Sequence, residues 1–201
     1  EDLSGSKIGI PGLFGASFVG WKALVYSVGI DEAAVDLEEI GFTQAAAVQQ
    51  GVVDGAVIYI ANEPIQLRNQ GLDVTVIEVS DYIDLVSNGL VAGDKLIAED
   101  PDLVRKMVRA SLRGLEYTLA NTDESFELAR RLIPEITAED VPVQRQVLDA
   151  SIELWRTDQP GFSNRQAWQD SLEFMQASGL LGDTGDLTVE QFYTNEFVES
   201  R

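Results

Sequence analysis

Short apolar segments alternate with glycine-terminated helical segments through the first 80 residues. We expect strands at residues 7–10, 36–40, 55–59 and 74–79. We expect helices at residues 16–28, 43–50 and 62–70, each followed directly by a glycine that suits a helix C-terminus. This alternation predicts βαβ units and a parallel sheet, hence an α/β fold. Because residues 55–59 are mostly apolar, we expect them to form a central strand.

The sequence after residue 100 has almost only helical patterns. We expect helices at residues 101–119, 123–132, 138–155 and 164–178, one short strand at 89–92, and a capping-type start at Thr188 in the tail. These helices either form a bundle or cover a sheet whose other strands lie in a polypeptide not included here. We interpret the chain as the later part of a longer two-lobe protein. The alternative is a complete small α/β domain followed by a helical domain.

Composition excludes several classes of function. The 201 residues include 34 acidic and 14 basic side chains, a net charge of −20 that repels nucleic-acid phosphates, so we expect no nucleic-acid partner. The chain contains no Cys and no His, which excludes disulfides, Ser-His or Cys-His catalysis and imidazole or thiolate metal sites. We expect no cofactor and no metal. The three tryptophans, Trp21, Trp155 and Trp168, fall in expected helices, where core packing is the default.

The glycine-rich turn PGLFGAS at residues 11–17 follows the first expected strand and begins a helix. Gly12 and Gly15 allow close approach of a ligand to the backbone, and N–H groups at a helix start can bind an anion or a polar atom. Ser17 adds a hydroxyl. The turn matches neither a P-loop nor a dinucleotide-binding turn. The alternative is a plain connection in which Ser17 caps the helix.

The segment from Tyr59 to Glu63 lies where the third expected strand meets its helix. Ligands of parallel sheets collect at the carboxyl ends of strands. Tyr59 could stack on a flat ring, Asn62 can donate and accept hydrogen bonds, and Glu63 can accept two of them from an amino-substituted heterocycle. The alternative is that Asn62 caps the helix and Glu63 complements its dipole.

Two further segments follow strand ends. In Gly41-Phe42-Thr43-Gln44, we expect Thr43 to cap the next helix, and Gln44 could point into a cleft. Residues 81–84 either line a cleft or cross between lobes, and we favour the crossover. The pair Glu38 and Glu39 lies within a strand, so the two carboxylates point to opposite faces and cannot form a catalytic pair.

Three runs of the sequence together resemble a known family. They are DLSGSKIGIPGLFGAS, LEEIGFTQAAAVQQGVVDGAVIYIANEPIQLRNQG and SNGLVAGDKLIAEDPDLVRKMVRASLRGL. They resemble ABC-transporter solute-binding proteins of the thiamine-pyrimidine-precursor type, in a superfamily that includes riboflavin, alkylsulfonate, taurine and nitrate binders. The resemblance implies a periplasmic-binding-protein-like type II fold with ligand held between two lobes. Residues 1–85 would be the second α/β lobe and residues 86–201 the mostly helical C-terminal part of the first lobe, whose N-terminal part is absent.

The same resemblance implies a function and a set of ligand contacts. The chain would belong to a non-enzymatic binding component that delivers a flat nitrogen heterocycle to a membrane permease. It would be periplasmic or extracellular, with a lipid anchor in the full-length protein. The implied ligand-facing residues are Gly12, Phe14, Gly15, Ser17, Gln44, Tyr59, Asn62 and Glu63.

The alternatives keep the same fold but change the ligand or the role. They are a riboflavin binder, a sulfonate or nitrate binder, a sensor domain and a pyrimidine-related enzyme. Lys22 is the only basic residue near the glycine-rich turn that could serve a sulfonate. A eukaryotic relative of this fold consumes its own active-site His in synthesis, and this chain has none.

Overall fold

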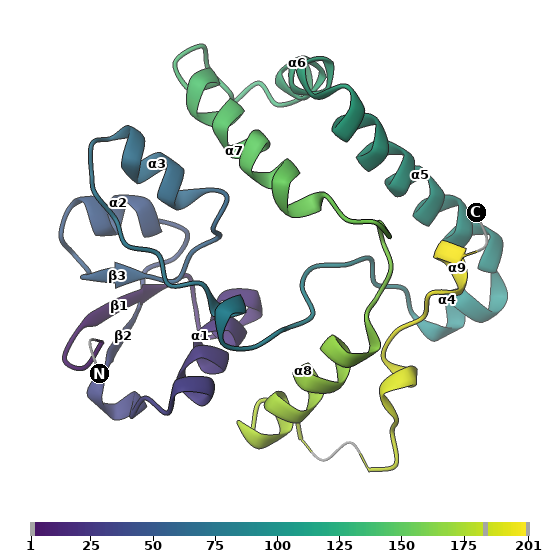
Figure 1. Cartoon of the computed structure of the whole chain (residues 1–201), viewed down its shortest axis with the longest axis horizontal. Helices are drawn as coiled ribbons and strands as arrows, with labels where there is room; N and C mark the ends of the chain where they lie inside the picture. Colours follow the sequence, from purple (N-terminus) through teal and green to yellow (C-terminus); the bar gives the residue numbers. More distant parts are fainter. Residues whose placement is uncertain (1–2, 183–184, 200–201) are drawn as a thin grey trace. The chain divides into compact units, whose positions relative to one another are not determined.

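A computed structural model describes residues 3–182 and 185–199 (Figure 1). The strands are β1 (Lys7–Ile10), β2 (Asp36–Glu39) and β3 (Gly55–Ala56). The α-helices are α1 (Gly15–Val28), α2 (Gln44–Gln49), α3 (Glu63–Asn69), α4 (Asp94–Glu99), α5 (Pro101–Ala120), α6 (Thr122–Leu132), α7 (Val141–Trp155), α8 (Arg165–Ala177) and α9 (Glu196–Glu199). Short 3-10 helices are η1 (Glu32–Ala34), η2 (Val79–Asp81) and η3 (Val189–Gln191).

The chain divides into two compact units. Unit 1 comprises Glu1–Ser87 and Gln166–Asp186, and unit 2 comprises Asn88–Arg165 and Leu187–Arg201. Unit 1 contains the strands and unit 2 is helical, which confirms the α/β class. The assignment of residues 1–85 and 86–201 to two lobes of a longer protein stays a prediction.

The sheet of unit 1 is parallel, with β1 in the middle. In the part of the chain that the structure describes, it has three strands in the order β2-β1-β3. Ile8 pairs with Leu37 of β2 on one side and with Gly55 of β3 on the other. The expectation that residues 55–59 form a central strand is therefore wrong: only Gly55–Ala56 is a strand, and it pairs with β1 alone.

Two other expected strands are absent from the residues that the structure describes. Residues 74–78 are irregular and lead into η2, and residues 89–92 are also irregular. From residue 72 to residue 77, half-buried and exposed positions alternate as they would in a strand. However, an extended segment becomes a strand only when its N–H and C=O groups pair with a neighbouring strand. The apolar pattern of this segment reflects burial of one of its sides. The segment does not pair with a neighbouring strand.

The core of unit 1 lies between β1 and α1. Ile8 and Ile10 alternate with Gly9, so both point to the same face of the sheet, where they pack with Trp21 and Val25 of α1. Ile10 is fully buried. Helix α2 contacts β1 and β3, and α3 packs on α2; both helices lie above the sheet in Figure 1.

Helix α8 packs within unit 1 although it is distant in sequence. The ring of Phe174 lies 5.6 Å from that of Tyr26 in α1, centroid to centroid. Ser171 accepts a hydrogen bond of 2.9 Å from the backbone N–H of Val86. Phe174 is 1% exposed, so α8 contributes a true core residue.

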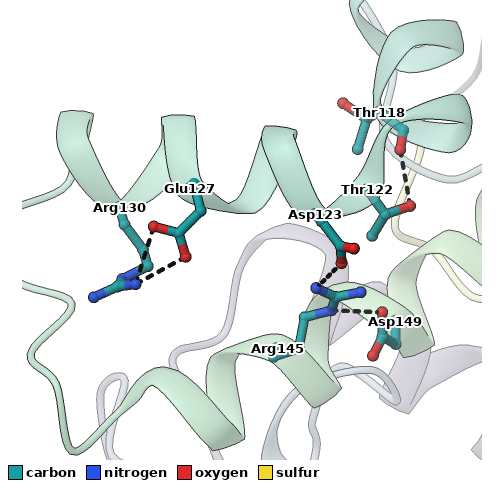
Figure 2. Close-up of polar contacts among 7 residues, drawn as sticks. All are labelled: Thr118, Thr122, Asp123, Glu127, Arg130, Arg145 and Asp149. Atoms are coloured by element: carbon teal, nitrogen blue, oxygen red, sulfur yellow. Dashed lines mark hydrogen bonds and ion pairs between the residues drawn. The ribbon is translucent and has the colours of Figure 1, made fainter.

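In unit 2, one arginine links α6 and α7. The Arg145 guanidinium donates through Nη1 to Asp123 and through Nε to Asp149, at 2.5 and 3.0 Å (Figure 2). It also lies over the ring of buried Phe126, 5.9 Å from the centroid. The Arg145 guanidinium thus lies over an aromatic ring and also binds two carboxylates.

The predictions for the tail and for the three tryptophans are confirmed only in part. The capping start expected at Thr188 is confirmed, because Thr188 and Gln191 form a capping box at η3. Trp21 is buried, as expected, and Trp168 is half-buried. Trp155 is 41% exposed at the last turn of α7, so its expected core position is wrong.

Replacing Ile10 tests the β1–α1 core. We expect Ile10→Ala to lower the free energy of unfolding by about 2–5 kcal/mol, because it removes a fully buried side chain and leaves a cavity. The matched control is Ile77→Ala, at a position 48% exposed, with an expected change within about 0.5 kcal/mol. Urea denaturation of the natural full-length protein measures both. Equal losses in the two variants would contradict the core described here.

Asp140 provides a pH-dependent contact before α7. The Thr137 hydroxyl and the Thr137 backbone N–H both donate to Asp140 Oδ2, at 2.6 and 2.9 Å, and hold the pKa of that carboxyl below its ordinary value. Because the folded-state pKa is lowered, this contact stabilises the fold above the ordinary pKa and is lost as pH falls through the lowered one.

We expect Thr137→Val to raise the pKa of Asp140 toward its ordinary value, since it removes the first of these two donors. Carboxyl-carbon NMR titration measures the change. Thr118→Val is the control, because the Thr118 hydroxyl donates to the Gly114 carbonyl rather than to a carboxylate. An Asp140 pKa that moves equally in both variants, or in neither, would refute the assignment.

Candidate functional site

The three strand–helix loops of unit 1 leave the same edge of the sheet because its strands are parallel. Beyond the ladder, Ile40 donates its N–H to Ile10 and Val57 donates to Gly9, both at 2.8 Å, so the loops remain joined as they leave the sheet. The chain passes from β1 to β2 on one side, and β3 lies on the other side of β1. Strand order 2-1-3 creates a topological switch point between β1 and β3, where open α/β sheets bind ligands.

The β1–α1 turn presents an exposed aromatic ring and a helix N-terminus. Phe14 is 66% exposed, and its ring lies against Gly12, where an added Cβ would clash with it. Phe14 is the N-cap residue of α1, and no side chain caps that helix. Ser17 lies inside α1, half-buried, so the alternative that Ser17 caps the helix is wrong.

A carboxylate from the neighbouring strand holds this turn. The backbone N–H of Leu13 donates to Glu39 Oε2 at 3.3 Å. Glu38, the adjacent residue, instead pairs with Lys7 at 3.0 Å. The sequence placed these two carboxylates on opposite faces of β2, but it did not indicate that Glu39 would bind the turn.

The β3–α3 loop is organised around the buried carboxylate of Glu63. Glu63 is 8% exposed. Its Oε2 accepts the backbone N–H of Tyr59 at 3.0 Å, and its Oε1 accepts from Asn62 Nδ2 at 3.3 Å. Asn62 in turn accepts from Gln66 Nε2 at 2.8 Å. The alternative that the Asn62 side chain caps α3 is wrong, because that side chain bonds to Glu63 and Gln66 instead.

This network leaves Tyr59 on the outside of the loop. Tyr59 is 51% exposed, while the acid that fixes its backbone is buried. Glu63 thus holds the loop with both of its oxygens, although each oxygen keeps a further lone pair that could accept a bond from a ligand. The Tyr and the Glu four residues later, which the sequence placed at this strand end, are one structural unit.

The β2–α2 loop departs from expectation at Thr43. Thr43 occupies the N-cap position of α2, but its hydroxyl donates to the Ile40 carbonyl at 2.7 Å and does not cap the helix. Gln44 is 5% exposed at the start of α2. Phe42, between them and the strand, is 83% exposed. Phe42 was not predicted to have a role, and the one signal for it in the sequence is an aromatic residue directly after a strand.

The expected site residues therefore lie in three loops at one edge of one sheet. Gly12, Phe14, Gly15 and Ser17 come from the β1–α1 turn, Gln44 from the start of α2, and Tyr59, Asn62 and Glu63 from the β3–α3 loop. Phe14 and Tyr59 are exposed and flank the switch point, whereas Gln44 and Glu63 are buried. Their contact with a ligand stays a prediction.

Other parts of the described chain offer weaker candidates. Over residues 3–182 and 185–199, no group of three or more Asp, Glu, Cys or His side chains is placed to hold a metal ion. A hollow of about 460 Å³ in unit 2 is lined by residues 120–124 and Arg145. The Arg145 guanidinium in this hollow is already bound to Asp123 and Asp149, so the hollow is a weaker candidate for ligand binding.

None of the described helices combines the length and the apolar character that crossing a bilayer requires.

A comparison with protein families identifies the family of the chain. Residues 1–125 of the 201 match the family described as NMT1/THI5 like. The chain belongs to the NMT1/THI5-like family. This confirms the family resemblance drawn from the sequence.

Individual relatives cover nearly the whole chain. It is 48% identical over 203 residues to the riboflavin-binding protein RibY of Chloroflexus aurantiacus, covering 98% of this chain and 57% of the relative. It is 25% identical over 192 residues to the formylaminopyrimidine-binding protein of Halalkalibacterium halodurans, covering 90% and 56%. It is 21% identical over 207 residues to the 4-amino-5-hydroxymethyl-2-methylpyrimidine phosphate synthase of Legionella pneumophila, covering 98% and 61%. The chain thus spans 56–61% of the length of these relatives.

The Glu63 network predicts local hydrogen exchange. We expect Glu63→Ala to accelerate exchange of the Tyr59 amide, because that N–H loses its acceptor. Glu63→Gln is the matched variant: its amide oxygen can still accept this bond, so protection should largely remain. NMR-detected exchange measures both. Unchanged Tyr59 protection in Glu63→Ala would contradict the described loop.

Proposed function

We propose that this chain is the ligand-contacting part of an extracytoplasmic solute-binding protein that delivers a flat nitrogen heterocycle to an ABC importer. Binding makes and breaks no bond. The observation that carries the proposal is the β1/β3 switch point, where exposed Phe14 and Tyr59 flank an α1 N-terminus that no side chain caps. Aromatic faces suit a flat ring, and uncapped N–H groups suit its polar edge.

Two ligands of this chemistry are supported by the names of the relatives. The 48% identical protein is named for riboflavin binding, and the 25% identical protein for formylaminopyrimidine binding. The higher identity favours riboflavin over a thiamine pyrimidine precursor. Both compounds present a planar ring with nitrogen and oxygen atoms along its edge.

A sulfonate or nitrate ligand is disfavoured by charge. Lys22, the basic residue that the sequence offers nearest the glycine-rich turn, has its Nζ 2.5 Å from Glu32 Oε1. An anionic ligand would have to displace that carboxylate in a chain whose net charge is −20.

Catalysis is the second candidate, because the Legionella pneumophila relative is named as a synthase. The present 201 residues contain no His and so cannot supply the imidazole that such synthesis consumes in a eukaryotic relative. The proposal therefore remains binding. It includes a membrane permease as partner and residues 1–85 as the second lobe of a longer, lipid-anchored protein.

Thermal unfolding of the natural full-length protein tests the proposal. We expect riboflavin or a monocyclic aminopyrimidine to raise the melting temperature, because a ligand at 100 times its Kd adds about 2.7 kcal/mol of stability. Tyr59→Ala should remove most of the shift, and Tyr59→Phe, which keeps the ring, should retain most of it. Val52→Ala, a 50% exposed position before β3 at the opposite edge, is the control. No shift with either compound would overturn the proposed function.

A further inference from the structure

One exposed aromatic side chain at the carboxyl edge has no role in the proposed function. Phe42 directly follows β2 and is 83% exposed, more than Phe14 at 66% or Tyr59 at 51%. Burial of a phenylalanine ring favours folding, and the fold leaves this one in solvent. Each of the three parallel strands is thus followed by one exposed aromatic ring.

The backbone around Phe42 is held in a defined turn. The Ile40 N–H donates to Ile10 of β1 at 2.8 Å, and the Thr43 hydroxyl returns to the Ile40 carbonyl at 2.7 Å. Gly41 has φ +61, in the left-handed region that glycine adopts readily. The Phe42 ring therefore projects into solvent from a turn whose flanking residues, Ile40 and Thr43, are hydrogen-bonded.

The spacing of the strands relates the three rings to ligand size. Neighbouring strands lie about 4.8 Å apart, so β2 and β3, on either side of β1, are about 10 Å apart. A single pyrimidine ring bound at the β1/β3 switch point would reach the loops of those two strands. A ligand must extend along the edge by a further strand spacing to engage the loop of β2.

We propose that Phe42 is a specificity-determining contact that favours fused multi-ring nitrogen heterocycles over single-ring pyrimidines. This inference rests on the proposed function, because it requires the ligand to lie at the carboxyl edge. Phe42 carries no charge and no polar atom, so it discriminates by ring area alone. A fused three-ring system gains its contact, and a single ring gains none.

Calorimetric titration of the natural full-length protein tests this role with riboflavin and a monocyclic aminopyrimidine as probes. We expect Phe42→Ala to weaken riboflavin binding by about three- to tenfold, the range for loss of one aromatic contact. Aminopyrimidine affinity should stay within about twofold of the parent. Phe42→Tyr should retain riboflavin binding and Phe42→Leu should not, which separates stacking from general apolar contact. Val52→Ala serves again as the exposed apolar control.

Each outcome separates this inference from the proposed function. If Tyr59→Ala loses riboflavin and Phe42→Ala binds it like Val52→Ala, the role of Phe42 is refuted while the proposed function stands. The same holds if Phe42→Ala weakens both probes equally. If the Phe42 ring instead contacts a protein partner, Phe42→Ala would leave ligand affinity unchanged. That result also refutes the proposed role of Phe42. If the parent protein binds neither probe, the proposed function fails and this inference fails with it.

Discussion

The parallel pairing of β1 with strands on both sides is the constraint on which unit 1 depends. It buries Ile8 and Ile10 against α1, and on the other face the missing side chain of Gly9 leaves room for Ile40 and Val53. Since all strands run the same way, their three following loops meet at one edge. The candidate site is thus a consequence of strand direction, before any particular side chain is considered.

Much of this arrangement could be predicted from local patterns. The strand at residues 7–10, the helix that ends before Gly29 and the start of α5 at Pro101 agree closely with the structure. Glycines and prolines mark these ends because backbone geometry requires them there. The predictions of strand pairing, in contrast, were wrong. Strand β3 is short and at the edge of the sheet, and residues 74–79 form no strand. An apolar pattern reports burial, whereas pairing depends on a partner distant in sequence.

The candidate site, too, could be predicted from the sequence only in part. The spacing of Tyr59 and Glu63 at a strand end was readable in the sequence. That spacing did not reveal that the Glu63 carboxylate accepts the backbone N–H of Tyr59. A donor to Glu63 can come either from a ligand or from the backbone of the same loop. Glu39 and Phe42 were missed for a related reason. Whether a carboxylate reaches the next turn, or a ring stays in solvent, is decided by packing between segments.

The bonds around Glu63 have a consequence for binding. Tyr59, Asn62, Glu63 and Gln66 bond within four positions of one another along the chain. The hydrogen bonds that shape this loop therefore join residues close in sequence. Preorganisation of this kind reduces the ordering entropy that binding would otherwise cost. In the proposed site, a solute arriving at Tyr59 would meet a loop whose backbone these hydrogen bonds already hold.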